Sequence, residues 1–396
     1  MKKILQLSTY PIINPLHGGQ IRVSQIRKYL ENHNCEVKSL SLSEMTHMDY
    51  TEDDFAVNNN ELQSITRVPF CSDYATSKLS IKGKAYQFLK NNIVPFSPDI
   101  ILLEQVWLWP AVKKLLKENS LPSDVKIIYS SQNIEYITKQ SLLNSHDIKG
   151  DDVDTTIQEI SNLEKELCQN ADTVISCTSI DADKFITMGA NTSLVCNNGV
   201  SRRLIDNNVT QHLLQSLENR KYALFVGSAY PPNALGFWEM MGESLAWLPP
   251  DCIILAAGGV SKILENYMPE SAKLFNCVNS DKIKKIGFVS EELLSSLLDN
   301  ASVILLPITI GGGSNLKTAE AIASRRAVVA TTTACRGFDI TNKLSNFIIT
   351  NNQNEFINST LTFLNNTENK VIDEDEKQIR ESVFWDNCLK PLDTII

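Results

Sequence analysis

The stretch that most constrains the fold is an apolar run, a glycine loop and a helix, followed by a second apolar run. The first run covers residues 303–306, three glycines occupy 311–313, and the second run covers 327–330. Short apolar runs bounded by turn residues are typical of buried strands, and strands joined through a helix are parallel. The pattern therefore predicts a β-α-β unit whose helix begins near Ser314.

The start of this helix has the properties of an anion site. The first N–H groups of a helix lack partners within it, the helix dipole places positive potential there, and glycines let a ligand approach the backbone. A capping box would need Glu or Gln three residues after the cap, but Ser314 and Asn315 are followed at that spacing by Lys317 and Thr318. The sequence therefore favours a diphosphate at the helix start.

A carboxylate lies at the edge of the apolar face of this helix. At 100° per residue, Leu316, Ala319 and Ile322 share one face, and Glu320 falls at its margin with Lys317 nearby. Sugar hydroxyls of a nucleotide would suit Glu320. A surface ion pair between Lys317 and Glu320, at i, i+3, is the alternative.

The stretch resembles the nucleotide-sugar site of the retaining GT-B enzymes of glycosyltransferase family 4. The resemblance implies that Glu320 holds the ribose hydroxyls, while N–H groups of residues 312–316 and the Lys317 ammonium hold the diphosphate. Two positions depart from the family pattern. Gly312 stands where the family usually has a Glu near the donor sugar, and Arg325 stands where it commonly has a helix-ending glycine.

The bulk properties describe an ordinary globular protein. A chain of 396 residues exceeds what one core normally serves, so we expect two domains. Its 43% hydrophobic and 21% charged residues are typical of soluble proteins. The net charge of −9 argues against a nucleic-acid partner, because such partners require a broad basic surface.

The sequence also predicts a cytoplasmic location. The apolar region at the N-terminus is interrupted by Gln6, Ser8 and Thr9, so it is interpreted as a first strand and not as a signal peptide. No run approaches 18 apolar residues, which excludes a spanning helix. Nine scattered cysteines without a C-x-x-C pair are typical of reduced thiols.

The N-terminal region repeats the strand, glycine loop and helix order. Residues 4–7 predict a strand, and Gly18 and Gly19 precede a helical pattern. By the family resemblance, these glycines face the donor phosphates across the cleft. A plain tight turn is the alternative, and the neighbouring His17 is expected to be either a ligand contact or solvated.

Three side chains are candidates for the acceptor side of the cleft. Glu104 follows the apolar strand 100–103, and ligands bind at the carboxyl ends of parallel strands. A structural salt bridge or a helix cap is an equal alternative for Glu104. Asn133 and Glu135 belong to a segment that resembles the family's His-Asn-Val-Glu motif, with Gln132 at the usual His position.

A basic amphipathic segment covers residues 107–117. It begins with Trp107 and Trp109 and continues with Lys113, Lys114 and Lys117. Such a face could lie on an anionic membrane, which would place the protein at the inner face of the membrane. A helix with an apolar packed face and a solvated lysine edge is the more common structure.

A new strand after residue 220 marks the second domain. The loop behind it contains Ser228 and Asn233 but lacks the Arg and Lys that many family members place there, so Asn233, helped by Lys317 or Arg336, would substitute. A helix cap at Asn233 is compatible with this role. Val289 lies in a segment that resembles the one that reads the nucleotide base. The resemblance thus gives a donor-binding set of Gly18, Gly19, Ser228, Asn233, Val289, Gly311, Gly312, Gly313, Ser314, Asn315, Leu316, Lys317 and Glu320.

Metal, hydrolase and kinase chemistry find little support. Asp152 and Asp154 form an Asp-x-Asp in a polar run and not after a hydrophobic strand, and the five His residues show no i, i+4 pair. No Gly-x-Ser-x-Gly elbow or Gly-Lys-Ser/Thr loop is present. We therefore expect no metal and no cofactor.

These observations predict an α/β protein with two Rossmann-like parallel-sheet domains facing across a cleft, the GT-B arrangement. We expect an acceptor domain at 1–200, a nucleotide-sugar domain at 201–378, and a helical segment at 379–396 that crosses back to the first domain. The resemblance implies metal-independent, retaining transfer of a sugar from a UDP- or GDP-linked donor to a glycan, lipid-linked or polysaccharide acceptor, without an assigned protein base. A GT-B nucleotide-sugar epimerase and a non-catalytic binding subunit are the alternatives.

Overall fold

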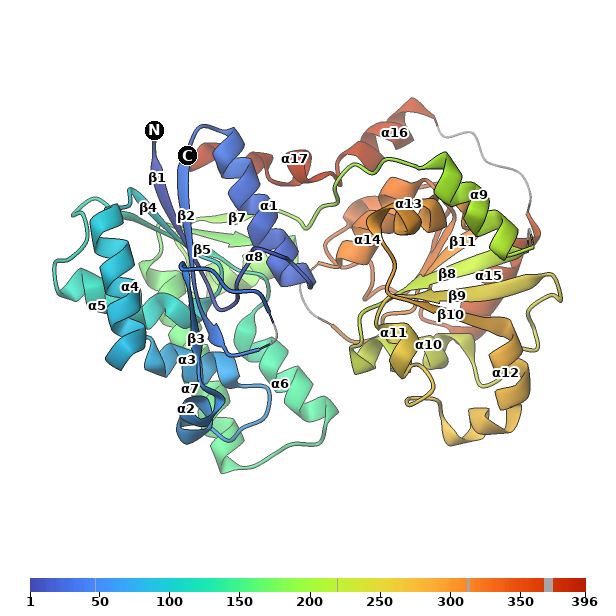
Figure 1. Cartoon of the computed structure of the whole chain (residues 1–396), viewed down its shortest axis with the longest axis horizontal. Helices are drawn as coiled ribbons and strands as arrows, with labels where there is room; N and C mark the ends of the chain where they lie inside the picture. Colours follow the sequence, from blue (N-terminus) through green and yellow to red (C-terminus); the bar gives the residue numbers. More distant parts are fainter. Residues whose placement is uncertain (47, 219, 312–313, 367–372) are drawn as a thin grey trace. The chain divides into compact units, whose positions relative to one another are not determined.

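The chain divides into two α/β units. The computed structural model describes residues 1–46, 48–218, 220–311, 314–366 and 373–396. Unit 1 comprises Met1–Asn197 together with Leu389–Ile396, and unit 2 comprises Asn198–Cys388 (Figure 1). Of the C-terminal segment predicted to join the first domain, residues 379–388 belong to unit 2 and Leu389–Ile396 to unit 1.

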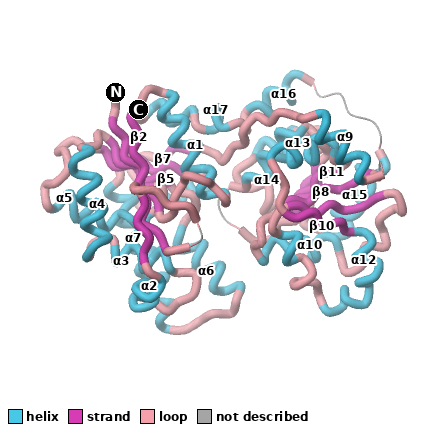
Figure 2. The backbone as a smooth tube through the Cα atoms, in the orientation of Figure 1, coloured by secondary structure: helices cyan, strands magenta, loops and turns pink. Residues whose placement is uncertain are grey.

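Unit 1 contains a parallel sheet in the order β3-β2-β1-β4-β5-β6-β7 among its described residues. Helices pack beside this sheet (Figures 1 and 2). The strands are β1 (Lys3–Ser8), β2 (Glu36–Glu44), β3 (Asp54–Val57), β4 (Ile100–Leu103), β5 (Lys126–Ser130), β6 (Thr173–Ser176) and β7 (Ser193–Val195). The helices are α1 (Gly18–Asn32), α2 (Asn59–Ile65), α3 (Ser72–Leu79), α4 (Gly83–Phe96), η1 (Val106–Leu108), α5 (Trp109–Lys117), α6 (Glu135–Ser145), α7 (Asp151–Asn170), α8 (Ser179–Thr187) and η4 (Lys390–Thr394).

Unit 2 contains a second parallel sheet in the order β10-β9-β8-β11-β12-β13 among its described residues. The strands are β8 (Lys221–Val226), β9 (Cys252–Ala257), β10 (Ile283–Gly287), β11 (Val303–Leu306), β12 (Val328–Ala330) and β13 (Phe347–Ile349). The helices are α9 (Asn207–Ser216), α10 (Pro231–Met241), α11 (Val260–Ile263), η2 (Glu270–Phe275), α12 (Asn276–Lys282), α13 (Glu291–Asn300), α14 (Leu316–Ser324), η3 (Asp339–Lys343), α15 (Gln353–Asn365), α16 (Glu374–Glu381) and α17 (Trp385–Cys388).

The residues of strand β8 show why both faces of the second sheet are covered. Tyr222 and Leu224 are buried in the core on one face, while Ala223 and Phe225 are buried in the core on the other. Alternate residues of a strand point to opposite faces, so an uninterrupted apolar strand requires helices on both sides. The predicted α/β class with two parallel-sheet domains is therefore confirmed.

One predicted helix is wrong in its extent. The sequence indicates helical character across residues 77–89, but the structure divides this region into α3 and α4. The helices meet at residues 80–82, and Gly83 begins α4 with a φ of 52°, a left-handed value that favours glycine. The polar, irregular sequence of residues 46–75 predicts loop and short strands, but the structure places α2 there and begins α3 at Ser72.

Candidate functional site

The strand order of unit 2 determines where a ligand can bind. β8 and β11 are neighbours at the centre of the sheet, and the chain moves outward from them in opposite directions, through β9 and β10 on one side and β12 and β13 on the other. Ligands of open parallel sheets bind at the carboxyl ends of the strands at such a switch point. The loops that leave this point carry Ser228 and Asn233 after β8, and residues 311–317 after β11.

The helix α14 begins where the sequence places the anion site. Asn315 is its N-cap, and the Asn315 side chain accepts a hydrogen bond from the Lys317 amide at 3.1 Å. The Leu316 amide has no recorded partner among the described residues. Asn198 contacts Ser314, the residue before the cap. The Asn198 backbone amide donates to Ser314 Oγ at 3.1 Å, and Asn198 Nδ2 donates to the Ser314 carbonyl at 2.8 Å. Within the described residues, the Lys317 amide is thus satisfied internally, and the Leu316 amide before it is available.

Lys317 lies in a polar triplet with Asn233 and Ser228. The Lys317 ammonium donates to Asn233 Oδ1 at 3.2 Å, and Asn233 Nδ2 donates to the Ser228 carbonyl at 3.1 Å and to Ser228 Oγ at 3.2 Å. Loss of solvation lowers the pKa of Lys317 to about 8, while the Glu320 carboxylate raises it in part. A poorly solvated ammonium whose hydrogen-bond partner among the described residues is the neutral Asn233 favours an incoming anion.

Glu320 forms an ion pair with a residue that the sequence did not indicate. Arg203 Nη2 donates to Glu320 Oε1 at 2.6 Å, and both side chains are about one-fifth exposed, at 19% and 20%. The alternative ion pair between Lys317 and Glu320 is not formed, since the Lys317 ammonium donates to Asn233 instead. Glu320 therefore lies on the predicted helix face, but its carboxylate is already oriented by a guanidinium.

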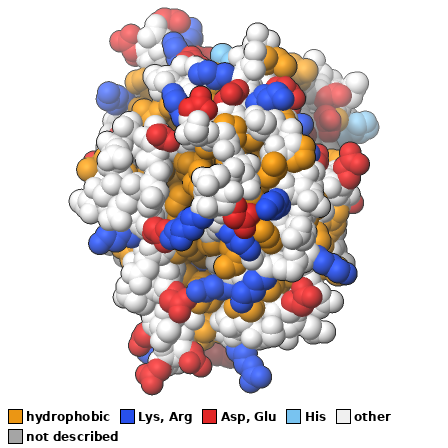
Figure 3. All heavy atoms as spheres, turned by 90° about the vertical axis from the view of Figure 1, so that its left-hand side faces the viewer, with side chains coloured by type: hydrophobic (Ala, Val, Ile, Leu, Met, Phe, Trp, Pro, Cys, Tyr) orange, Lys and Arg blue, Asp and Glu red, His pale blue; other side chains and the backbone are white. Residues whose placement is uncertain are grey.

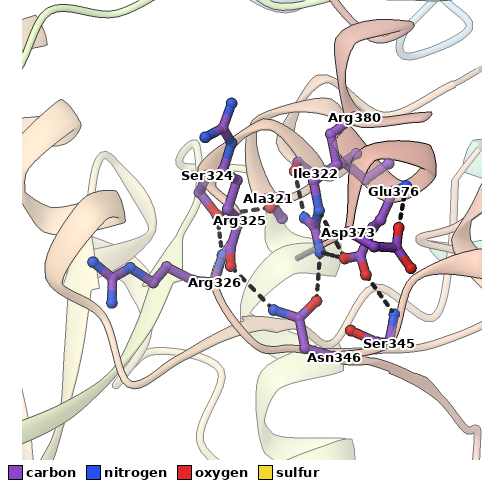
Figure 4. Close-up of polar contacts among 10 residues, drawn as sticks. All are labelled: Ala321, Ile322, Ser324, Arg325, Arg326, Ser345, Asn346, Asp373, Glu376 and Arg380. Atoms are coloured by element: carbon purple, nitrogen blue, oxygen red, sulfur yellow. Dashed lines mark hydrogen bonds and ion pairs between the residues drawn. The ribbon is translucent and has the colours of Figure 1, made fainter. Parts of the chain in front are cut away.

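The C-terminal end of α14 is anchored by polar contacts (Figure 4). Arg325 ends the helix in the left-handed region with a φ of 62°, as expected for a position where the family commonly has glycine. Arg380 Nη1 donates to the Ile322 carbonyl at 2.6 Å, and Asn346 Nδ2 donates to the Arg325 carbonyl at 3.1 Å. Glu376 accepts from Arg380 Nε at 3.0 Å. A cation at a helix C-terminus is favourable, and this one fixes α14 from the end opposite the candidate site.

The middle of α10 approaches the loop after β11 very closely. A Cβ atom built on Gly236 would lie 2.1 Å from the Pro307 carbonyl oxygen. No other residue type fits this contact without displacing the loop backbone. Asn233, placed three residues earlier, is the third residue of α10 and not its cap, because Tyr230 occupies the cap position. The predicted helix cap at Asn233 is thus wrong, and its amide instead faces Ser228 and Lys317.

The remaining donor-site candidates of unit 2 are the three loop glycines and Val289. Gly312 and Gly313 lie outside the described residues. Gly311 is exposed, and a Cβ built on it meets nothing within 4 Å. Val289 is half-buried against the core beside β10, two residues before α13 begins.

In unit 1, Gly18 and Gly19 form the first turn of α1. His17 is the N-cap, and its Nδ1 accepts from the Gln20 amide at 3.4 Å, so its position is structural. A Cβ on Gly19 would lie 2.6 Å from Gln132 Oε1 and 2.7 Å from the Tyr10 hydroxyl. Gln132 Nε2 in turn donates to the Tyr10 hydroxyl. Gly19 therefore lies against a polar cluster at the carboxyl ends of β1 and β5, and a larger residue there would have to displace the Gln132 and Tyr10 side chains.

Glu104 is fully buried directly after β4. Gln6 Nε2 donates to Glu104 Oε1 at 2.5 Å, and Oε2 has no hydrogen-bond partner among the described residues. Burial raises the pKa of Glu104 to about 7, against the lowering effects of the Gln6 hydrogen bond and the Arg22 charge. Glu104 thus lies at the carboxyl end of its strand as predicted, inside a polar network that reaches β1 and α1.

The other two acceptor candidates flank the start of α6. Glu135 is the first residue of this helix and is buried, and burial raises its pKa to about 8 although Lys139 lowers it. Asn133 is half-buried, and its carbonyl accepts from Ser131 Oγ at 2.5 Å. Sequence reasoning missed Glu164, which accepts from the Glu135 amide at 3.0 Å and from Tyr129 Oη at 2.8 Å. Glu164 thereby supplies the carboxylate that the helix start favours.

The predicted membrane-facing segment has a packed aromatic face. Trp107 and Trp109 are buried in the core, and Lys113 forms an ion pair with Glu166. Figure 3 shows this side of unit 1, where basic side chains lie beside acidic ones with hydrophobic ones between. A hollow of about 690 Å³ between α4 and α5 contains lysines, but Lys90 donates to Glu118 at 2.7 Å there. These contacts favour a helix with a packed apolar face and a solvated lysine edge over a helix that lies on a membrane.

The described residues offer neither a metal site nor a membrane-spanning helix. They contain no group of three or more His, Cys, Asp or Glu side chains that could hold a metal ion. Asp152 and Asp154 lie in the first turn of α7, where the helix dipole favours carboxylates. Among the helices that the structure describes, none is long and apolar enough to cross a membrane. All nine cysteines are free thiols, and only Cys277 is exposed.

Comparisons with known proteins agree with this geometry. Residues 220–366 match the model of the family described as glycosyl transferases group 1. This match covers the β8 and β11 loops and α14, and it supports the enzyme class predicted from the sequence, a glycosyltransferase. None of the curated proteins compared with the chain matches it in sequence.

Solved structures establish the fold as GT-B. The chain is similar to a sucrose-phosphate synthase from Thermosynechococcus elongatus, with 13% identity, a TM-score of 0.74, and coverage of 100% of this chain and 98% of the other. It is also similar to Anabaena HepE in complex with UDP-glucose, at 15% identity, a TM-score of 0.66 and full coverage of both chains. An E. coli trehalose-6-phosphate structure bound with UDP-2-fluoro glucose shows 13% identity and a TM-score of 0.64, covering 98% of this chain and 96% of the other.

Proposed function

We propose that this protein transfers a sugar from a nucleotide diphosphate donor to an acceptor hydroxyl. The observation that carries the proposal is on α14, where the Lys317 ammonium and the Glu320 carboxylate lie three residues apart in the first turns of a helix that starts at the sheet's switch point. A cation and free helix amides suit a diphosphate, and a carboxylate suits the two ribose hydroxyls. We propose a UDP-linked donor before a GDP-linked one, since similar structures hold UDP-glucose and UDP-2-fluoro glucose.

The chemistry we propose is retaining and needs no metal. The bond from the anomeric carbon to the phosphate oxygen breaks, the acceptor oxygen bonds to that carbon on the same face, and the acceptor proton passes to the leaving phosphate. The task of the protein is to stabilise the charge that develops on the diphosphate, which Lys317 and the start of α14 would do. No protein base is required for this sequence of steps.

The acceptor would be a glycan, a lipid-linked saccharide or a polysaccharide precursor, bound by unit 1. Glu104, Asn133 and Glu135 are the candidate contacts at the carboxyl edge of its sheet. We propose that the protein works in the cytoplasm, where nucleotide sugars are available, with lipid-linked acceptors met at the inner face of the membrane.

The test is nucleotide release from UDP-glucose, UDP-galactose and GDP-mannose with and without EDTA. We expect one donor to release its nucleoside diphosphate, and the release should be faster when an acceptor hydroxyl is present. EDTA should leave the rate unchanged. Proton NMR of the product should show that the new glycosidic bond has the same anomeric configuration as the donor. Binding without release or transfer would favour a non-catalytic subunit, and a change of the sugar without an acceptor would favour an epimerase. Failure of every nucleotide to bind would refute the proposed function.

A further inference from the structure

The Arg203 side chain lies between two elements of the candidate donor site. Its Nη2 donates to Glu320 Oε1 on α14 at 2.6 Å, and its Nε lies 4.0 Å from Glu291 Oε2 at the first residue of α13. Val289, the candidate for reading the base, stands two residues before that helix. A single guanidinium thus spans from the candidate ribose carboxylate to the segment beside the candidate base site.

The backbone around Arg203 is fixed by its neighbours. The Val200 amide donates to the Val383 carbonyl at 2.9 Å, and the Trp385 amide donates to the Val200 carbonyl at 3.2 Å. The connector before α9 is therefore held against the segment that follows α16, and Arg203 projects from an anchored base.

The ion pair with Arg203 engages one carboxylate oxygen of Glu320, and within the described residues the second oxygen can still accept a hydrogen bond. Oε1 accepts from Arg203, and no further hydrogen bond to Glu320 is recorded within the described ranges of the chain. Lys317 is directed to Asn233 and does not occupy the second oxygen. Because the guanidinium fixes one oxygen of the carboxylate, the other oxygen points in a defined direction. Two adjacent hydroxyl groups can donate to an acceptor oxygen that is oriented in this way.

We infer that Arg203 is a positioning residue for the nucleoside: it fixes Glu320 through Oε1 so that Oε2 accepts from the ribose hydroxyls. The inference rests on the proposed function and adds a residue outside the family-like stretch. Arg203 itself does not touch the nucleotide. Its effect should therefore depend on the presence of the ribose hydroxyls and be absent for a nucleotide that lacks them.

The experiment compares UDP with 2′,3′-dideoxy-UDP by calorimetry on the full chain. If GDP binds the wild-type protein more tightly, GDP and its dideoxy form replace the pair. The variants are Arg203→Met, Arg203→Lys and Glu320→Gln, and the matched control is Arg202→Met. Arg202 is the adjacent arginine, is 62% exposed, and pairs with Glu381 and not with Glu320. Thermal melting of each variant checks that it is folded.

We expect Arg203→Met to weaken UDP binding by about tenfold, as typical for loss of a supporting contact, and to change dideoxy-UDP binding by less than about twofold. Arg203→Lys should restore part of the UDP affinity, and Arg202→Met should match the wild type. Equal losses for both nucleotides, unchanged UDP binding, or tighter UDP binding would overturn the inference. If Glu320→Gln leaves the ratio between the nucleotides unchanged, the ribose assignment fails, and if no nucleotide binds, the proposed function fails.

Discussion

The Lys317 ammonium donates a hydrogen bond to Asn233 Oδ1 at 3.2 Å and thereby joins the start of α14 to the start of α10. The two residues come from the loops behind β11 and β8, the neighbouring strands at the switch point of the sheet. Since Asn233 is neutral, this contact does not neutralise the ammonium, and the Glu320 carboxylate compensates its charge only in part. A diphosphate would supply the missing negative charge.

Removal of this ammonium should weaken nucleotide binding. We expect Lys317→Met to reduce UDP affinity at pH 7 by about 1.5–3 kcal/mol, the usual contribution of a hydrogen bond to a charged group. Isothermal calorimetry measures the change. Lys273→Met is the control, because Lys273 is a surface lysine of the same unit that pairs with Glu270. Equal affinities of Lys317→Met and wild type would exclude Lys317 from the site.

The pH dependence of binding follows from the pKa of Lys317, which is about 8 in the free protein. A bound diphosphate stabilises the ammonium and raises that pKa, so affinity should be constant below pH 8 and fall as the pH rises above it. Binding near pH 8.5 should also take up a proton. UDP itself is fully ionised there, because the second phosphate pKa is about 6. Calorimetry in buffers of different ionisation enthalpy measures the uptake, which should vanish in Lys317→Met.

Glu320→Ala should reduce nucleotide affinity by about 1–3 kcal/mol while the protein stays folded. The carboxylate is one-fifth exposed, and its loss leaves Arg203 close to solvent, so stability should change little. Equilibrium binding and a thermal melt test the two parts separately. Unchanged affinity would remove Glu320 from the site, and a large drop in melting temperature would show that its ion pair is mainly structural.

Gly236→Ala should destabilise unit 2 by about 1–3 kcal/mol, because the added methyl group would lie 2.1 Å from the Pro307 carbonyl oxygen and forces the loop to move. The displaced loop leads to residues 311–317, so nucleotide binding should weaken as well. Urea denaturation gives the free energy of unfolding. Leu235→Ala is the control on the same helix, since Leu235 is 45% exposed and its truncation should have a much smaller effect. Equal losses in both variants would contradict the close-contact explanation.

Glu104→Gln should increase stability more at high pH than at low pH. Burial raises the pKa of Glu104 to about 7 from its ordinary 4.5, so the folded protein binds the proton more tightly than the unfolded chain does. The wild type therefore loses stability as the pH rises from about 4.5 to 7, by a total on the order of 1–3 kcal/mol, and Gln lacks this loss. Denaturation at pH 5 and pH 8 measures the difference. A gap between the two proteins that is independent of pH would refute the assignment.

The elements around α14 could be predicted from the sequence because their determinants are local. The apolar run of β11, the glycines and the periodicity of Leu316, Ala319 and Ile322 all lie within one short stretch. The left-handed backbone of Arg325 is in line with the family resemblance, in which a helix-ending glycine is common at this position. Local propensity and burial agree here, which is the condition under which sequence reasoning succeeds.

The contacts that organise the site could not be predicted, because they join residues far apart in the chain. Arg203 and Glu320 are separated by 117 positions, and Asn198 and Ser314 by 116. Arg203 lies in a polar connector whose composition indicates only a loop. The role of Glu164 was hidden for a similar reason, since its partner amide at Glu135 begins a different helix. The position of such a partner depends on packing, and a single sequence does not encode it in any local pattern.

Unit 1 is assembled from two separate parts of the chain, Met1–Asn197 and Leu389–Ile396. The Tyr29 hydroxyl on α1 donates to Asp393 Oδ1 at 2.6 Å, which ties the late segment to one of the earliest helices. During synthesis, domains generally fold in order from the N-terminus. The contacts of unit 1 with Leu389–Ile396 can therefore form only after the ribosome has translated all of unit 2.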